Sequence, residues 1–296
     1  MDQFITAPTE LRFSNLSVDT RFADQYYHGT TDFLIRLPST MRNVMRIAFA
    51  SIELPLVAPV FSAAKGNTCF IVGSYVVTIP DSSYILGGLQ MAPEIQKAMD
   101  ATGLMDVSCN YDLPTNRFSF VNGGASAVTI SLVSPDIGSC AVPCVSSVAT
   151  AARFWGIGYN LGFRTKTIVV PAGETVTATE APQIQAPAYY LVQVRCPDMM
   201  EDTLHRTEAG SSVQALAKVI LRNGAYVLNT DDGANNLRKE TTFVSPTSIS
   251  QLRVTLVDAY GRLVEMGDVD WSMTFEFVEV MNACQANKVI RAVGHC

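Results

Sequence analysis

Charged residues are scarce in this sequence, and its basic residues form no run. Lys, Arg, Asp and Glu make up 16% of the 296 residues, against about 25% in an average soluble domain. The formal net charge is −6. A direct grip on nucleic acid needs a concentrated basic patch that displaces counterions, and no segment supplies one. Direct binding of DNA or RNA is therefore not expected.

The sequence also lacks a long uninterrupted apolar segment. The N-terminus, Met-Asp-Gln-Phe-Ile-Thr, has neither the basic start nor the apolar stretch of a secretory signal. The longest apolar stretch, 47–61, is interrupted by Glu53, Pro55 and Pro59, and it is too short to cross a bilayer. We therefore expect no transmembrane segment, and a chain that is made in the cytoplasm and stays soluble until it assembles.

Motifs of catalysis are missing as well. The sequence contains no Gly-x-Ser-x-Gly elbow, no His-Glu-x-x-His, no phosphate-binding Gly-x-x-x-x-Gly-Lys and no dinucleotide fingerprint. Its three histidines, His28, His205 and His295, lie far apart. We therefore predict no catalytic residue, no cofactor and no metal site, and a protein that is not an enzyme. A dispersed active site assembled by folding stays open as a third alternative.

Seven cysteines are scattered along the chain, which does not match the short, Cys-dense pattern of a secreted disulfide scaffold. We expect most of them to be buried thiols. Cys140 and Cys144 flank Ala-Val-Pro, close enough to bond or to form half of a zinc site. A second close pair that would complete a zinc site is absent from the sequence. The acidic loop 229–236 likewise lacks the ligand spacing of an EF-hand.

Apolar residues, in contrast, are abundant, at 48%. They suffice for a large core, and so few charges on the outside suit a subunit whose faces are covered by neighbours. A neutral protein with a large core is the alternative that composition leaves open. Most apolar segments are short, rich in Val, Ile and Tyr, or alternate with polar residues, as in strands. The predicted strands are 32–37, 44–54, 69–79, 127–133, 189–196, 215–221, 241–244, 252–258 and 271–280, with a hairpin at 105–121.

One segment has helical periodicity. Ile85, Leu89, Ala92, Ile95 and Met99 recur every three or four residues, and Gly103 follows, where a left-handed cap is expected. A second helical or irregular segment is expected at 148–163, and a Pro-rich loop or insertion at 171–188. The strand count against one or two helices predicts an all-β fold, a sandwich or barrel of antiparallel strands.

The last strand allows a prediction of register. Trp271, Met273, Phe275 and Phe277 alternate with polar residues, so they should share the face that points into the core. Val269 has the same parity and should join them.

The order of strands and turns in the C-terminal half resembles minor capsid or penton-type proteins of large icosahedral double-stranded DNA viruses. The segments that carry this resemblance are Tyr189–Val194, Ala217–Leu221, Phe243 to Leu252, Leu252–Leu256, the turn Asp258–Gly261 and Asp270–Phe277, with Ser51–Pro55 and Leu161–Phe163 upstream. It implies an antiparallel jelly-roll sandwich with one or two short helices in inter-strand insertions. We expect one such domain over 31–280, with insertions near 57–68, 82–103 and 171–188.

The resemblance further implies a structural component of a virus capsid that links major capsid capsomers. The expected partners are the major capsid protein, other minor capsid proteins and possibly further copies of this chain, within a virion assembled in the host cytoplasm. The alternative is a penton or surface protein that binds a host receptor or glycan, with Tyr26, Tyr27 and His28 as candidate contacts. Residues 1–30 and 281–296 are expected to form an N-terminal arm and a C-terminal tail, and at least one of them is expected to order against a neighbouring capsid subunit. The alternative is that both ends fold back on their own sheet.

Overall fold

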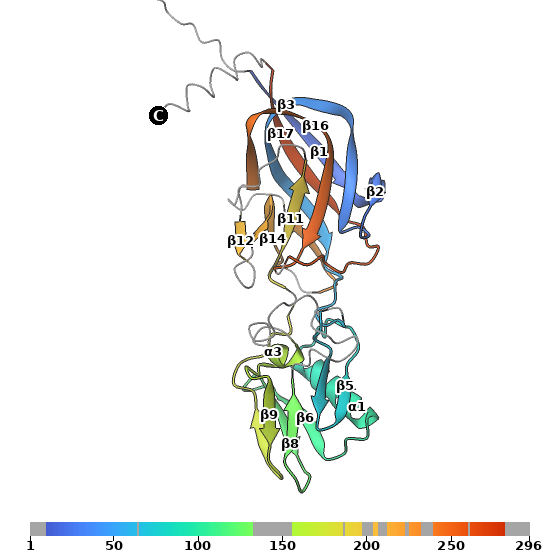
Figure 1. The fold of residues 1–296 in the computed structure, drawn as a ribbon, viewed down its shortest axis with the longest axis vertical. Helices are drawn as coiled ribbons and strands as arrows, with labels where there is room; N and C mark the ends of the chain where they lie inside the picture. Colours follow the sequence, from blue (N-terminus) through green and yellow to red (C-terminus); the bar gives the residue numbers. More distant parts are fainter. Residues whose placement is uncertain are drawn as a thin grey trace, which may run out of the picture. The chain divides into compact units, whose positions relative to one another are not determined.

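The computed structural model describes residues 10–63, 65–132, 156–185, 187–196, 204–206, 212–222, 225–231, 239–259 and 261–281. These residues form two compact units (Figure 1). Unit 1 combines the N-terminal part of the chain, up to Ala58, with the C-terminal part from Pro187, and unit 2 is the intervening Pro59–Ala186. None of the described helices is long and apolar enough to span a membrane.

Unit 1 is a sandwich of two antiparallel layers. The first layer pairs β1 (Leu11–Asp19), β17 (Ser272–Val280), the second half of β3 (Asp32–Pro55) and the first half of β16 (Lys239–Val257). The second layer pairs the first half of β3, the second half of β16, β11 (Tyr189–Arg195) and β14 (Ala217–Ile220). Two short strands extend the pairing along β3: β15 (Leu228–Asp231) and β2 (Gln25–Tyr26).

Two long strands join the layers. β3 and β16 stay paired over most of their length, and three register shifts between Thr242 and Gln251 mark the bend where both pass from one layer to the other. Figure 1 shows this arch at the upper end of unit 1. The bend explains why the sequence shows separate segments at 32–37 and 44–54, and again at 241–244 and 252–258, where the structure has two continuous strands.

The order of the strands identifies the fold of unit 1 as a jelly roll. Counting each half of β3 and β16 separately gives eight strand segments in chain order. Their spatial order is first, eighth, third and sixth in one layer, and second, seventh, fourth and fifth in the other. This is the arrangement of two Greek keys that defines a jelly roll. The predicted antiparallel jelly-roll sandwich with short helices is confirmed.

The limits of the jelly roll differ from those expected from the sequence. It begins at Leu11, because β1 pairs with β17 along its whole length. Residues 11–30 therefore belong to the sandwich and are not a free arm. Residues 1–9 and 282–296, which include Phe4, Val289 and Ile290, lie outside the described residues.

Instead of three small insertions in one domain, unit 2 is inserted as a whole between β3 and β11. Its boundaries fall within the predicted insertions at 57–68 and 171–188. Unit 2 contains α1 (Gly88–Ala101), α3 (Ile157–Leu161) and two sheets. One sheet has the order β10 (Thr175–Thr177), β7 (Arg117–Asn122), β6 (Val107–Asp112), and the other β5 (Tyr75–Thr78), β4 (Cys69–Val72), β8 (Val128–Ser131), β9 (Thr167–Val170).

Within unit 2, the predicted hairpin and helix are confirmed, and one predicted strand is wrong. The predicted 105–121 hairpin is present as β6 and β7. The predicted helix is α1, and Gly103 follows it with φ of 87°. The expected single strand 69–79 is wrong: β4 and β5 form a hairpin there, which turns at Gly73 with φ of 59°. The remaining short elements are η1 (Thr20–Phe22) and the pair β12 (Leu204–Arg206) and β13 (Ser212–Gln214).

Each unit has its own apolar core. In unit 1, Trp271, Met273, Phe275 and Phe277 are all buried in the core, as their spacing predicts. The prediction for Val269 is wrong, because it is 36% exposed and precedes β17. Unit 2 encloses the fully buried Phe61, Phe70, Phe118 and Phe120.

Along β3, the side chains that face the core change twice between even and odd residue numbers. Ile47 and Phe49 face the core on odd positions, whereas Val44, Ile52 and Leu54 face it on even ones. The pairing with β17 skips one residue of β3 at each change, so each skipped residue is the extra member of a β-bulge. A bulge moves the residues that follow it to the opposite face of the sheet. The regular alternation of side chains in the β3 sequence does not show where these bulges lie.

Candidate interaction surface

Among the described residues, no group of His, Cys, Asp and Glu is arranged to hold a metal ion. His28 lies in the exposed turn before β3 and His205 lies in β12, while His295, Cys140 and Cys144 fall outside the described part of the chain. Cys69 is disulfide-bonded. Cys109 is a buried free thiol, and burial raises its pKa well above the usual range. This thiol is therefore protonated and unreactive at neutral pH.

β1 is the edge strand of the first layer. It pairs with β17 on one side, and no other described strand pairs with it on the other side. Alternate residues of β1 face outward: Leu11 is 49% exposed and Phe13 is 60% exposed. Their cross-strand partners on β17 are Val280 and Val278, which are themselves buried. An exposed edge with apolar side chains is a template for further pairing and packing.

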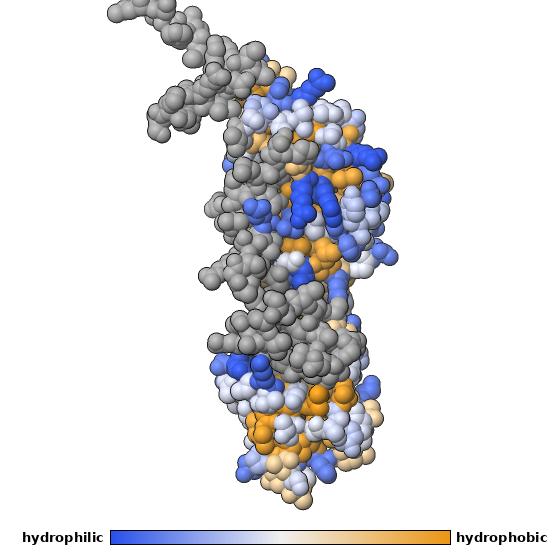
Figure 2. Space-filling model, viewed as in Figure 1, coloured by the Kyte–Doolittle hydropathy of each residue, from blue (hydrophilic) through white to orange (hydrophobic). Residues whose placement is uncertain are grey.

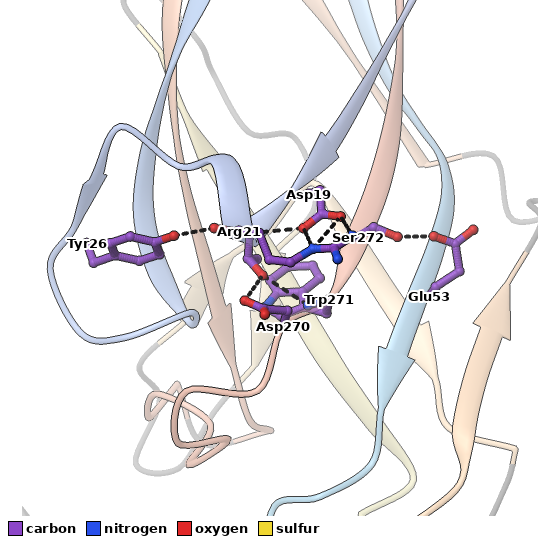
Figure 3. A network of polar contacts seen from close by, with 8 residues as sticks. Asp19, Arg21, Tyr26, Glu53, Asp270, Trp271 and Ser272 are labelled. Atoms are coloured by element: carbon purple, nitrogen blue, oxygen red, sulfur yellow. Dashed lines mark hydrogen bonds and ion pairs between the residues drawn. The ribbon is translucent and has the colours of Figure 1, made fainter.

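The chain leaves β1 through a corner that polar contacts hold rigidly (Figure 3). Thr20 is fully buried in η1, and its backbone N–H donates to the carbonyl oxygen of Trp271 at 3.0 Å. Its hydroxyl accepts from the backbone N–H of Trp271 at 3.0 Å and donates to Asp270 Oδ1 at 3.2 Å. Tyr26 adds a hydrogen bond from its hydroxyl to the Thr20 carbonyl oxygen, and Ser272 donates to Glu53. The corner is therefore fixed to Asp270 and Trp271, just before β17, and β17 is in turn linked to β3 through Ser272 and Glu53.

The same corner presents an aromatic ring to solvent. Phe22 is 77% exposed, and the guanidinium carbon of Arg21 lies 5.7 Å from its ring centroid. Arg21 donates from Nε to Asp19 Oδ1 at 3.0 Å, and these hydrogen bonds lower the pKa of the Asp19 carboxyl. Phe22 is thus a large apolar side chain on a fixed backbone. A residue of this kind suits an interface, because little chain entropy is lost when it binds a partner.

Tyr26, Tyr27 and His28, the candidate contacts from the sequence, are all exposed. Tyr26 is 46% and Tyr27 is 41% exposed, and the side chain of His28 is 67% exposed. The three are consecutive and lead from β2 into the turn before β3. Packing in the core of unit 1 therefore does not account for these side chains.

An ion pair at the start of β3 fixes an arginine on the outer face of the second layer. Asp32 is almost completely buried, and Arg253 donates to both of its carboxylate oxygens, from Nε at 2.8 Å and from Nη2 at 2.7 Å. These bonds hold the pKa of the Asp32 carboxyl below its usual range, with smaller contributions from His28 and Thr255. The Arg253 guanidinium lies 4.1 Å from the Tyr27 ring centroid.

Unit 2 exposes apolar side chains of its own. Ile85 and Leu86, just before α1, and Leu89, in its first turn, are each more than half exposed. The strand residues Tyr75, Val76 and Val169 are about half exposed. Figure 2 shows hydrophobic areas on the visible face of this unit. These residues, like Leu11, Phe13 and Phe22 on unit 1, are large apolar side chains that are accessible to solvent.

In comparisons with known proteins, no family model and no curated protein sequence matches the chain. Several solved structures match the chain, among them a penton protein and a virophage structure. The mavirus penton protein matches with a TM-score of 0.48 and 9% identity, over 92% of this chain and all of that chain. A chain of the Sputnik virophage structure matches with a TM-score of 0.44 and 12% identity, over 92% of this chain and 98% of that chain. At such scores and identities the similarity does not decide what this chain does.

Proposed function

We propose that this chain is a structural component of a virus capsid, located in the virion, that contacts neighbouring subunits through the outer surface of its jelly roll. The observation that carries the proposal is the apolar edge at β1, where Leu11 and Phe13 face outward on a paired, ordered strand. The fixed Phe22 at the adjoining corner adds to this surface. The jelly-roll topology and the resemblance of the sequence to minor capsid and penton-type proteins support the same role.

The partners that this function implies are the major capsid protein, other minor capsid proteins and further copies of this chain. Packing of Leu11 and Phe13 against such a partner would remove apolar area from water at roughly 25 cal/mol per Å². The edge of β1 would at the same time offer backbone hydrogen bonds to an added strand. Assembly in the host cytoplasm follows from the same proposal.

The test is incorporation into particles. The double variant Leu11→Ser/Phe13→Ser, expressed in infected cells alongside the wild-type chain, should be depleted from purified particles although it folds in isolation. Met105→Ser is the matched control, because Met105 is 82% exposed on unit 2 and its replacement removes a comparable apolar side chain. Equal incorporation of the double variant and the control would exclude β1 as the contact. Absence of the wild-type chain from particles would exclude the capsid function altogether.

A second candidate function is binding of a host glycan at the exposed Tyr26, Tyr27 and His28. Aromatic rings beside polar groups stack on sugar rings, and both tyrosines are well exposed. This role predicts binding to a glycan array that Tyr27→Ala abolishes, whereas capsid assembly through β1 would be unaffected by this substitution.

A further inference from the structure

Three adjacent strands of the second layer each place an arginine on the same outward face. Arg195 on β11 lies directly opposite Arg253 on β16. Arg253 in turn lies opposite Leu34 on β3, and Arg36 is two residues further along that strand. Because cross-strand partners and alternate residues share a face, the three side chains project from the same side of the layer. We call Arg36, Arg253 and Arg195 the arginine row.

This arrangement is electrostatically unfavourable for the chain alone. Directly opposed residues in an antiparallel pair have Cβ atoms about 4.5–5.5 Å apart, and like charges in these positions destabilise the sheet. Asp32 neutralises Arg253. In the part of the chain that the structure describes, the guanidinium groups of Arg36 and Arg195 form no ion pair, although both side chains are exposed. The Asp24 carboxylate lies beside Arg36, where its Oδ2 accepts from the Arg36 backbone N–H at 2.6 Å. Among the described residues, two arginines without an ion pair thus flank one that is paired, in a chain of net charge −6.

The surroundings of the row suit a ligand with carboxylates. The Nε and Nη2 atoms of Arg253 donate to Asp32, and its guanidinium lies against the Tyr27 ring, while the Arg253 side chain as a whole is 35% exposed. Its orientation is therefore set before any ligand arrives. Gln251 lies opposite Arg36 and adds a neutral hydrogen-bonding group. Figure 2 shows strongly hydrophilic side chains gathered over the middle of the visible face of unit 1, where β11 and β16 lie toward the viewer in Figure 1.

We propose that the arginine row docks an acidic segment of another protein. Arginine and tyrosine are the residues that protein interfaces favour, and desolvated arginine–carboxylate pairs are among their strongest contacts. A nucleic acid fits less well, because its binding relies on many neutralised phosphates and this face offers only the row, on a chain of net negative charge. The occupant is thus an anionic polypeptide and not a polyanion in general.

The spacing of the row sets the pattern of the segment. Diagonal neighbours on adjacent strands lie about 7–8 Å apart and direct partners about 5 Å, so the row spans roughly 12 Å. In an extended peptide, side chains of the same face recur every two residues, or about 6.6 Å. A segment with Asp or Glu at alternate positions, crossing β3, β16 and β11, therefore brings one carboxylate to each arginine.

The probe is a fluorescent synthetic peptide of alternating Glu and Ser, with a Gln-Ser peptide as its neutral counterpart, measured by fluorescence anisotropy with the full-length protein. The double variant Arg36→Gln/Arg195→Gln should weaken binding of the Glu-Ser peptide by about tenfold or more, the equivalent of 1.4 kcal/mol. Lys97→Gln/Lys166→Gln, which removes two exposed cations from unit 2, is the control of equal charge and should change binding less than about twofold. Arg195→Gln alone should not lower the midpoint of thermal unfolding, because the exposed Arg195 guanidinium forms no ion pair with a described residue.

Several results would overturn the proposal. The first is no binding of the peptide by the wild-type chain, or an equal loss in the control variant. Tighter binding of single-stranded DNA or heparin than of the peptide at the same salt concentration would show a general polyanion site. If sedimentation shows self-association that the Arg36→Gln/Arg195→Gln variant loses, the occupant is a second copy of this chain instead. Since β1 is unchanged in these variants, failure here leaves the proposed capsid role to its own test.

Discussion

Phe33 and Trp271 meet edge to face in the core of unit 1, with ring centroids 5.8 Å apart and planes at 78°. Phe33 belongs to the second layer, and Trp271 immediately precedes β17 of the first. The indole N–H of Trp271 also donates to the carbonyl oxygen of Thr30 at 2.7 Å. The two layers of the jelly roll are thus joined at this end by an aromatic pair and a buried hydrogen bond, in addition to the bent strands at the other.

The core face of β17 is expected to contribute strongly to stability. Phe275 is fully buried and packs against Phe49 with ring centroids 6.1 Å apart. Phe275→Ala should lower the free energy of unfolding by about 3–5 kcal/mol, because it leaves a cavity as well as losing apolar burial. Val269→Ala, at a position 36% exposed, is the control and should cost less than about 1 kcal/mol. Urea denaturation of both variants checks this, and a small effect at Phe275 would contradict the register of β17.

The Asp32–Arg253 ion pair predicts a pH-dependent contribution to stability. The pKa of Asp32 is lowered in the folded protein by the hydrogen bonds from Arg253, so its stabilisation is complete above the unfolded pKa of about 3.9 and is lost as the pH falls through the folded pKa. Asp32→Asn should cost about 1–3 kcal/mol at pH 7, reduced by the partial exposure of Arg253. The difference from wild type should shrink below about pH 4. Asp268→Asn, at an exposed carboxylate, is the control in thermal melts across pH.

A glycine in α1 permits a close approach that another residue would block. A Cβ added to Gly88 would lie 2.3 Å from two ring atoms of Tyr111. Gly88→Ala should therefore destabilise unit 2 by about 1–3 kcal/mol through overpacking, although alanine is normally the better helix former. Gly123→Ala is the control, since its nearest neighbour would be the Asp106 carbonyl oxygen at 3.6 Å. The double variant Gly88→Ala/Tyr111→Ala should regain part of the loss, and a stabilising Gly88→Ala would contradict this packing.

The features that sequence predicted are those set by local periodicity. The core face of β17, the β6–β7 hairpin and α1 each depend on a repeat of two or of three to four residues within one segment. The sequence predicts one strand over 69–79 in place of the β4–β5 hairpin, because Gly73 is a single glycine within a run that is otherwise rich in β-branched residues. The two bulges of β3 could not be predicted, because they arise from its pairing with β17, which the sequence of β3 does not encode locally.

The division of the chain and the arginine row depend on long-range pairing. Residues 11–19 look irregular, and only β17, some 260 residues later, makes them a strand. Arg36, Arg195 and Arg253 are scattered in sequence, so their common face appears only once the registers of β3, β16 and β11 are known. The predicted insertions near 57–68 and 171–188 were marked by proline and loop residues, but nothing local shows that they enclose one folded unit.

The insertion of unit 2 leads to the last prediction, that residues 59–186 fold on their own. This segment has its own apolar core, in which Phe70 and Phe120 are fully buried with ring centroids 6.0 Å apart. A chain of this length can bury enough apolar surface to offset its conformational entropy, and its two sheets pair only within the unit. The isolated fragment should unfold cooperatively in urea, with a midpoint that Phe120→Ala lowers. A fragment that gives dispersed amide signals in NMR spectra would support independent folding, whereas a fragment without a cooperative transition would mean that unit 2 needs the jelly roll in order to fold.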